Sequence, residues 1–232
     1  MFNIKVADIA IGIENKYDYI KILCRDYITD SEPQFSVSVT DEEIARENSE
    51  QPGDFPVAYL ETLAVYRKIA EKLSEYNGFL MHGVLMSAEG HGILLTAESG
   101  TGKSTHAALW LKLLGERCEI INGDKPLIRV IDGVAYAYGT PWCGKEGINK
   151  NAGVKLTDIC FLERGAENSV CEVKKNEIIQ NLLPSIHIPS GDGVIAVLDA
   201  VDAAAKGARF WRIACNMDIS AAETSYNAII NK

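Results

Sequence analysis

The stretch TAESGTGKST, Thr96 to Thr105, constrains the fold of this 232-residue chain more than any other feature. The apolar run ILLTA ends at Ala97, so a predicted strand leads into the stretch. The segment from Lys103 to Gly115 has apolar residues at helical spacing and a glycine at its end. A glycine-rich turn between a strand and a helix is typical of a phosphate-binding loop in an α/β domain.

The residue types of this predicted phosphate loop (residues 96–105) suit that chemistry. Gly100 and Gly102 let backbone N–H groups approach a polyphosphate, and the start of a helix favours an anion. Lys103 is predicted to reach the terminal phosphates and Ser104 to bind Mg²⁺. Ala97 stands where the usual pattern has a glycine, and a small residue suffices for the turn. The predicted nucleotide-binding residues are Ser99, Gly100, Thr101, Gly102, Lys103, Ser104 and Thr105.

Strand patterns dominate around the loop. Residues 79–87 are predicted to form one strand, which turns at 88–92 and pairs antiparallel with 93–97. Further strands are expected at 119–122, 127–130, 134–138, 154–163, 170–173 and 210–215. Helices are expected at 103–115, with Ala107, Ala108, Leu111 and Leu114 on one face, at 176–183, at 193–205 and from a capping box at Ser220. The fold class predicted is α/β, with a mixed or antiparallel sheet and flanking helices.

The first third of the chain has no chemistry that the sequence identifies. Residues 2–39 are β-rich, Thr40 to Glu43 resemble a capping box, and a helix is predicted over 55–76, ended by Gly78. Its predicted apolar stripe is Tyr59, Leu63, Tyr66, Ala70 and Leu73. We therefore divide the chain into a β-rich N-terminal region, 1–78, packed on the core as a scaffold or oligomer surface, and a nucleotide-binding domain, 79–232.

Charge and hydrophobicity limit the partners. The formal net charge of −9 disfavours nucleic acid, although a local loop can still hold a nucleotide. No apolar run is long enough to cross a bilayer, and the first residues lack a signal-peptide layout, so a cytoplasmic protein without a membrane partner is expected. The six cysteines show no C-x-x-C spacing, which favours buried thiols over a metal or redox site.

From Phe79 to Tyr138 the sequence resembles the catalytic domain of HPr kinase/phosphorylase and, more distantly, ATP-dependent phosphoenolpyruvate carboxykinase. The resemblance rests on HGVLM before the loop, on GILLTAESGTGKS and on EIINGD after the loop helix. It is also similar to the many uncharacterised bacterial kinase-like proteins of that superfamily. The resemblance implies a kinase of this P-loop type that uses ATP and Mg²⁺; the sequence leaves open whether the nucleotide is ATP or GTP.

The resemblance also implies roles for residues near the loop. His82 matches a histidine that lies near the transferred phosphate, and a strand histidine satisfied by the backbone is the alternative. Asp124 matches the second of two adjacent aspartates, so it is expected to act as a metal ligand or base. Gly123 occupies the place of the first aspartate. The base therefore stays open among His82, Asp124 and Glu146, and phosphorylase activity is in doubt.

A third cluster, GTPWCGKEGINKN, follows in residues 139–151. Its glycines, proline and tryptophan suggest a shaped loop, and a corresponding loop in HPr kinase helps to bind substrate. Trp142, Lys145 and Glu146 are the candidate substrate-loop residues, and a surface turn with an exposed ion pair is the alternative.

The resulting expectation is a kinase that transfers the γ-phosphoryl group of ATP to a hydroxyl, on serine of a protein, a peptide or a small metabolite. The predicted catalytic residues are His82, Lys103, Asp124 and Glu146, and the predicted metal ligands are Ser104 and Asp124. A nucleotide-binding regulatory or accessory protein without phosphotransfer is the alternative, and a carboxykinase-type enzyme ranks last. A homo-oligomer is compatible with the resemblance.

Overall fold

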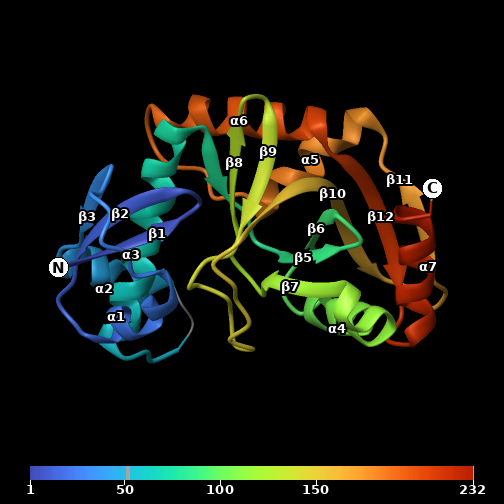
Figure 1. Cartoon of the computed structure of the whole chain (residues 1–232), viewed down its shortest axis with the longest axis horizontal. Helices are drawn as coiled ribbons and strands as arrows, with labels where there is room; N and C mark the ends of the chain where they lie inside the picture. Colours follow the sequence, from blue (N-terminus) through green and yellow to red (C-terminus); the bar gives the residue numbers. More distant parts are fainter. Residues whose placement is uncertain (51–52, 232) are drawn as a thin grey trace.

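The computed structural model describes residues 1–50 and 53–231, with the side chain of residue 50 left out. Its N-terminal part contains a separate three-stranded sheet: β1 (Phe2–Val6) and β2 (Ile9–Glu14) form an antiparallel hairpin, and β3 (Phe35–Ser38) pairs parallel with β2. Three helices accompany this sheet: α1 (Tyr19–Leu23), α2 (Asp41–Glu50) and α3 (Val57–Leu73) (Figure 1). The predicted β-rich character of residues 2–39 is confirmed, with a short helix between its strands.

The ends of α2 and α3 show how local residues set these boundaries. Thr40 and Glu43 form a reciprocal capping box, because Thr40 N–H donates to Glu43 Oε2 at 2.8 Å and Glu43 N–H donates to Thr40 Oγ1 at 3.2 Å. The prediction that Gly78 ends α3 is wrong. Asn77 takes the left-handed conformation, at φ 54°, and Gly78 opens the next strand. Leu60, Val65 and Ile69 fill the core from α3, whereas Tyr59 and Leu63 of the predicted stripe are only partly buried.

The main sheet is mixed, as predicted, and it curls around one long strand. Its path runs β4-β8-β9-β10-β6-β5-β7, and β12 and β11 continue from β10 on a branch. The first residues of β10 pair antiparallel with β9, while its later residues lie between the parallel strands β6 and β12. The strands are β4 (Gly78–Leu80), β5 (Val84–Ala88), β6 (His91–Thr96), β7 (Cys118–Asn122), β8 (Leu127–Ile131), β9 (Val134–Tyr138), β10 (Gly153–Arg164), β11 (Ser169–Glu172) and β12 (Arg209–Cys215).

The antiparallel hairpin before the predicted phosphate loop is confirmed as β5 and β6, joined at Glu89 and Gly90, which both have positive φ. The prediction of one strand over 79–87 is wrong, because the chain leaves the sheet between β4 and β5. There His82 N–H donates to Ser185 O at 2.7 Å and Gly83 N–H donates to Asp124 O at 2.8 Å. These contacts with loops outside the strands separate β4 from β5 and set His82 at the break.

Helices cover both faces of the main sheet (Figure 1). The four are α4 (Lys103–Leu114), α5 (Ile178–Leu182), α6 (Gly193–Gly207) and α7 (Ile219–Ile229). α4 and α7 enclose one apolar cluster around Trp110 and Trp211, and α6 packs on a second cluster. Trp110 is fully buried at the centre of α4, whereas Ala108 of the predicted stripe is exposed. No helix in the described part of the chain is long and apolar enough to cross a membrane.

The predicted capping box at Ser220 is wrong. Helix α7 begins one residue earlier, at Ile219, so Ser220 lies inside the helix. The Ser220 hydroxyl instead accepts a hydrogen bond from Asn168 Nδ2 at 3.0 Å. The helix itself is confirmed, because its buried residues, such as Ala222 and Ile229, pack into the cluster around Trp110.

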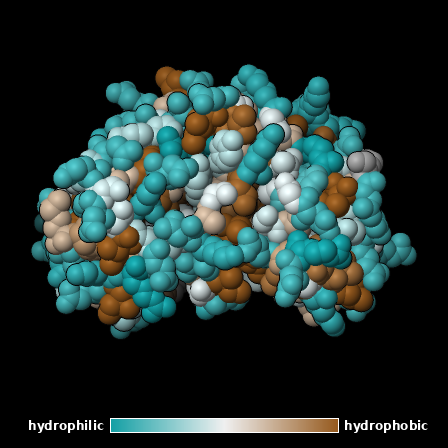
Figure 2. All heavy atoms as spheres, viewed as in Figure 1, coloured by the Kyte–Doolittle hydropathy of each residue, from teal (hydrophilic) through white to brown (hydrophobic). Residues whose placement is uncertain are grey.

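The N-terminal part shares a hydrophobic cluster with the main sheet. That cluster joins residues of β1, β2 and α3 to Leu127, Tyr138 and Trp142. Hydrophilic side chains cover most of the face in Figure 2, and apolar residues lie there in separate small patches. The shared cluster fixes α3 against the segment that follows β7, which carries Asp124.

Candidate phosphate and transfer site

The predicted phosphate loop connects β6 to α4 (Figure 1), so the strand–loop–helix arrangement is present. Gly100 and Gly102 have φ values of 78° and 123°, which L side chains rarely adopt. A Cβ placed on either glycine would have no heavy atom of the described residues within 4 Å, apart from the glycine itself and its two chain neighbours. The loop therefore leaves open space beside backbone that leads into the N-terminus of α4, as an anion site requires.

Lys103 lies inside this loop rather than extending into solvent. It is 8% exposed, and its Nζ donates to Ala97 O at 2.9 Å and to Glu98 O at 3.3 Å. Burial lowers the pKa of Lys103, Asp124 opposes that effect, and Lys125 adds to it. Two carbonyls are weak partners for an ammonium group compared with a phosphate, so the lysine is poised to exchange them for an anion.

Arg164, which no motif in the sequence marks, also reaches the loop. In the parallel pairing of β10 with β6, Phe161 lies opposite Thr96, the last residue of β6. Arg164 therefore extends beyond the end of β6, where its Nη2 donates to Gly100 O at 2.7 Å. Only the register of two strands distant in sequence could have revealed this contact.

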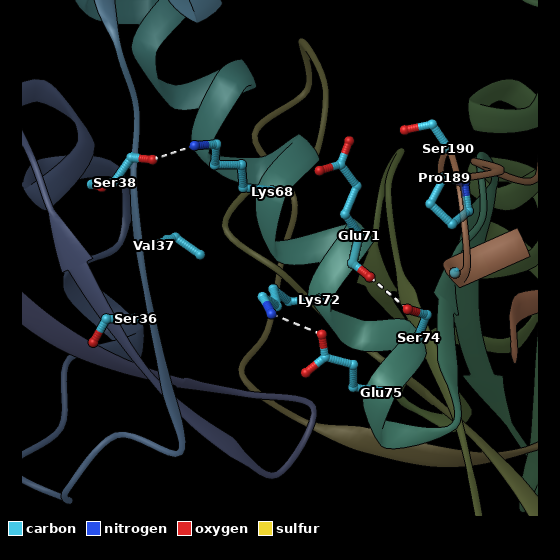
Figure 3. Close-up of a pocket in the computed structure, with 11 residues that line it drawn as sticks. Ser36, Val37, Ser38, Lys68, Glu71, Lys72, Ser74, Glu75, Pro189 and Ser190 are labelled. Carbon is cyan, nitrogen blue, oxygen red and sulfur yellow. Dashed lines mark hydrogen bonds and ion pairs between the residues drawn. The ribbon is translucent and has the colours of Figure 1, made fainter.

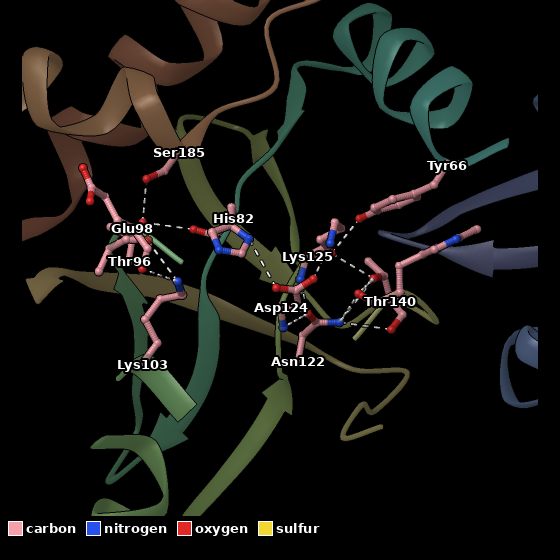
Figure 4. Close-up of polar contacts among 12 residues, drawn as sticks. Tyr66, His82, Thr96, Glu98, Lys103, Asn122, Asp124, Lys125, Thr140 and Ser185 are labelled. Atoms are coloured by element: carbon pink, nitrogen blue, oxygen red, sulfur yellow. Dashed lines mark hydrogen bonds and ion pairs between the residues drawn. The ribbon is translucent and has the colours of Figure 1, made fainter. Parts of the chain in front are cut away.

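A charged centre lies beside the loop, formed by His82, Asp124 and Lys125 (Figure 4). His82 Nδ1 is 3.2 Å from Asp124 Oδ1, and Lys125 Nζ makes an ion pair with Asp124 Oδ2. The structure thus brings together His82 and Asp124, both of which the sequence indicates as site residues. Lys125, which the sequence does not indicate, joins them. Both carboxylate oxygens of Asp124 have a partner.

Buried polar groups hold this centre in place. Asn122 is fully buried, and its Oδ1 accepts hydrogen bonds from the N–H groups of Asp124, at 3.0 Å, and Lys125, at 2.7 Å. The carbonyl of Lys125 accepts from Tyr66 Oη at 2.6 Å and from Thr140 Oγ1 at 2.8 Å. Because Tyr66 belongs to α3, the N-terminal part of the chain contributes directly to the geometry of the centre.

His82 is tied to the loop through its backbone. The Thr96 hydroxyl lies 3.0 Å from His82 O and 2.6 Å from Ser185 Oγ. Burial lowers the pKa of His82 below 6.5, Lys103 and Lys125 lower it further, and Asp124 opposes them. The imidazole is therefore mainly neutral at pH 7, with Nδ1 at Asp124 and Nε2 without a partner among the described residues.

The third cluster folds over the centre, but its residues differ in access. Trp142 is 5% exposed, stacks on Tyr66 with ring centroids 4.1 Å apart, and donates from Nε1 to Thr62 O at 2.9 Å. Its ring anchors the loop, which leaves no surface for a substrate to contact. Lys145 and Glu146 are exposed, and in the described part of the chain neither makes a hydrogen bond or ion pair. The structure brings neither of these two into contact with His82 or Asp124.

Gly123 is enclosed by the same loop. Its N–H donates to Ile148 O at 3.0 Å, and a Cβ there would lie 2.7 Å from Cys143 O. An aspartate at this position would therefore collide with the backbone. The packing of the 139–151 loop against this position therefore requires a glycine where the first aspartate was expected.

The donor chemistry suits Mg²⁺ that arrives with a nucleotide. Among the described residues no group of three or more His, Cys, Asp or Glu side chains could hold a metal alone. Ser104 and Asp124 offer a hydroxyl and a carboxylate oxygen, and the Ser104 hydroxyl makes no hydrogen bond within the described residues. Mg²⁺ usually takes one or two protein oxygens and completes its shell with phosphates and water.

Two hollows lie away from this site. One, of about 410 Å³, lies between β3, α3 and the start of α6, where Lys72 pairs with Glu75 at 2.7 Å (Figure 3). The other, of about 560 Å³, is lined by residues such as Lys5, Asp8 and Tyr136. Neither contains a residue of the predicted phosphate loop.

No protein-family model and no curated protein sequence matches the chain. Among solved structures, an HPr(Ser) kinase/phosphatase from Coxiella burnetii is similar at a TM-score of 0.37 and 9% identity, over 66% of this chain and 97% of that one. This is a distant structural resemblance. The functional proposal therefore depends on the residues of this chain.

Proposed function

We propose that the chain binds ATP with Mg²⁺ at the predicted phosphate loop and transfers the γ-phosphoryl group to a serine-type hydroxyl. The observation that carries the proposal is the contact between His82 and Asp124 beside the loop that holds Lys103. A neutral imidazole next to a carboxylate can take a proton from the acceptor hydroxyl during phosphoryl transfer. The nearby Lys103 would hold the phosphate that is transferred. The sequence resemblance from Phe79 to Tyr138 supports the same reaction class.

Each residue then has a distinct task. The N–H groups of residues 99–105 and Lys103 would hold the phosphates, and Ser104 and Asp124 would hold the metal. Mg²⁺, when bound, would neutralise negative charge on the phosphates. The acceptor oxygen forms its bond to the γ-phosphorus as the bond between that phosphorus and the oxygen of ADP breaks, and ADP leaves with the electron pair.

We assign the base to His82 because its Nε2 has no hydrogen-bond partner among the described residues. The acceptor proton would pass to Nε2, and Asp124 would stabilise the imidazolium that results. Contacts of this kind are often long before substrates bind, so 3.2 Å is compatible with the role. Glu146 is exposed and makes no hydrogen bond or ion pair with His82 or Asp124 in the described part of the chain, which makes it a weaker candidate. Exposed residues of the 139–151 loop, such as Lys145, would shape the acceptor side, and the buried Trp142 would anchor the loop.

A second function is favoured by one observation. The packing of Gly123 against Cys143 leaves a single carboxylate where the resembled kinases have two. A protein that binds nucleotide and responds to it without transfer needs the phosphate loop and no base. The two functions differ in whether nucleotide is consumed when a hydroxyl acceptor is present.

Calorimetric titration tests the shared premise. ATP and GTP with Mg²⁺ are titrated into the wild type, Lys103→Ala and the control Lys112→Ala, which removes an exposed lysine of the same helix. We expect the wild type and the control to bind nucleotide. Lys103→Ala should bind it at least tenfold more weakly, because it loses one charge-assisted hydrogen bond to phosphate. Absence of binding to the wild type would reject the proposal. Transfer from labelled ATP to serine-containing peptides and small hydroxy compounds then separates the kinase from the binding protein.

A further inference from the structure

Lys125 is a cation of the centre that the proposed transfer does not yet use. Its Nζ pairs with Asp124 Oδ2, and no other ion pair involves it in the described part of the chain. Its backbone is fixed by three hydrogen bonds, from its N–H to Asn122 and to its carbonyl from Tyr66 and Thr140. The side chain is 37% exposed, so the ammonium group can move while its backbone stays in place.

A metal ion at Asp124 would compete with the present partners of its carboxylate. Oδ1 faces His82, Oδ2 faces Lys125, and a divalent cation at either oxygen would lie against one of them. Both backbones are hydrogen-bonded, but His82 is the less mobile partner because its ring turns about two side-chain torsions, whereas the ammonium of Lys125 is carried on a four-carbon chain. Like charges repel, so a metal at Asp124 would displace the ammonium of Lys125.

Once displaced from Asp124, the ammonium group of Lys125 would pair with another anion. Lys103 and Lys125 both lower the pKa of His82 and Asp124 opposes them, so two ammonium groups lie near one carboxylate here, although the whole chain has a net charge of −9. Phosphoryl oxygens are the anions that the proposed reaction brings to the centre. Figure 4 shows Lys103 and Lys125 on opposite sides of His82, carried by α4 and by the turn after β7. The two lysines could therefore contact a phosphoryl group from two sides.

We propose that Lys125 exchanges partners during the reaction: it neutralises Asp124 in the ligand-free protein and contacts the γ-phosphoryl group once Mg²⁺ occupies Asp124. The proposal rests on the proposed function, because it requires nucleotide at the loop and metal at Asp124. It makes Lys125 a second phosphate-binding lysine whose availability depends on the metal.

Calorimetric affinities for ATP and ADP test the exchange, each measured with Mg²⁺ and with EDTA. The variants are Lys125→Met, Lys125→Arg as the conservative form, and Lys112→Met as a control that removes an exposed lysine of α4. With Mg²⁺ we expect the wild type to bind ATP more tightly than ADP. In Lys125→Met the ratio of the two affinities should fall about tenfold, because one charge-assisted contact to the γ-phosphoryl group is lost. With EDTA the preference should not depend on Lys125, because Lys125 stays on Asp124. Lys125→Arg should keep most of the preference.

Direct metal binding gives a readout that does not depend on transfer. Electron paramagnetic resonance of Mn²⁺ without nucleotide should show at least tenfold tighter binding to Lys125→Met than to the wild type, since Asp124 is no longer neutralised. An unchanged Mn²⁺ affinity together with an unchanged preference for ATP would overturn the exchange. If the wild type bound neither nucleotide, the proposed function itself would fail, which is a distinguishable result. Thermal unfolding of each variant checks that the fold is retained.

Discussion

The α-carbon of Gly123 faces the carbonyl oxygen of Cys143 so closely that a Cβ would lie 2.7 Å from that oxygen. The resembled kinases have an aspartate at the matching position, so replacing Gly123 by aspartate would be the natural attempt to restore a second carboxylate. The structure argues against that attempt, because the 139–151 loop occupies the space. The two positions together explain why this centre has one aspartate.

We expect Gly123→Asp and Gly123→Ala to destabilise the fold and to give no gain in transfer. Forcing atoms into packed backbone costs about 1–3 kcal/mol, and the aspartate adds a partly buried charge. Denaturant unfolding measures this cost. Gly207→Ala is the matched control, since no atom lies within 4 Å of the Cβ position there. A Gly123→Asp protein as stable as wild type would show that the loop yields, and the packing argument would then be wrong.

Gly102 offers a test of the predicted phosphate loop itself. Its φ of 123° strains any other residue, although there is room for a side chain. We expect Gly102→Ala to reshape the loop and to weaken binding of ATP with Mg²⁺ by about tenfold or more, equivalent to about 1.4 kcal/mol. Titration calorimetry measures this. Gly115→Ala, which strains the other end of α4 at φ 57°, should lower stability without changing ATP affinity. Equal loss of affinity in both variants would point to a general effect on α4.

The sequence predicted the local features of the site and missed the long-range ones. The strand, turn and helix around residues 96–105 follow from residue types at short spacing, and so do the β5–β6 hairpin and the capping box at Thr40. Arg164 reaches Gly100 only because β10 lies parallel to β6, and Tyr66 reaches Lys125 only because α3 packs on the main sheet. Neither pairing leaves a signal in a single sequence.

Two differences from the sequence-based expectations come from tertiary contacts. Residues 79–87 have an uninterrupted strand pattern, yet His82 and Gly83 hydrogen-bond to Ser185 and Asp124, which are distant in sequence. Trp142 lies in a segment that the sequence indicates to be a shaped loop with a candidate substrate contact at Trp142, and the ring is buried because Tyr66 provides a stacking surface. Tertiary contacts override local preference in both places.

His82 is expected to affect turnover more than nucleotide binding. His82→Asn should lower the rate of transfer by about 10²- to 10⁴-fold, the usual worth of a general base, and leave the affinity for ATP nearly unchanged. Steady-state kinetics with the identified acceptor, alongside calorimetry, separates the two effects. A variant that retained full turnover would exclude His82 as the base and leave Asp124 as the candidate.

The electrostatics of the same residue can be measured without an acceptor. Nuclear magnetic resonance titration should give His82 a pKa below 6.5, and Lys103→Met should raise that pKa because Lys103 lowers it. Asp124→Asn should change it in the opposite direction, since the carboxylate favours the charged imidazole. If Lys103→Met left the pKa unchanged, the lysine would not face the centre in solution as it does here.

His106 makes stability depend on pH at the interface of α4 and α7. It is 2% exposed, its Nε2 is 3.0 Å from Ser225 Oγ, and its Nδ1 has no hydrogen-bond partner in the described part of the chain. Burial lowers its pKa to about 4 from the ordinary value of 6.5. Between these two values the unfolded chain takes up a proton that the folded chain does not, so the free energy of unfolding falls as pH decreases.

The expected loss through His106 is about 3 kcal/mol between pH 7 and pH 4, from roughly 1.4 kcal/mol for each pH unit of the shift. Other groups also titrate in this range, so the comparison is between wild type and His106→Gln, measured by urea unfolding at several pH values. The variant starts from lower stability because the contacts with Ser225 and Trp110 change, but its stability should fall less steeply below pH 6.5. Parallel curves for the two proteins would show that His106 is already protonated in the fold, or accessible to water, and would contradict its burial between the two helices.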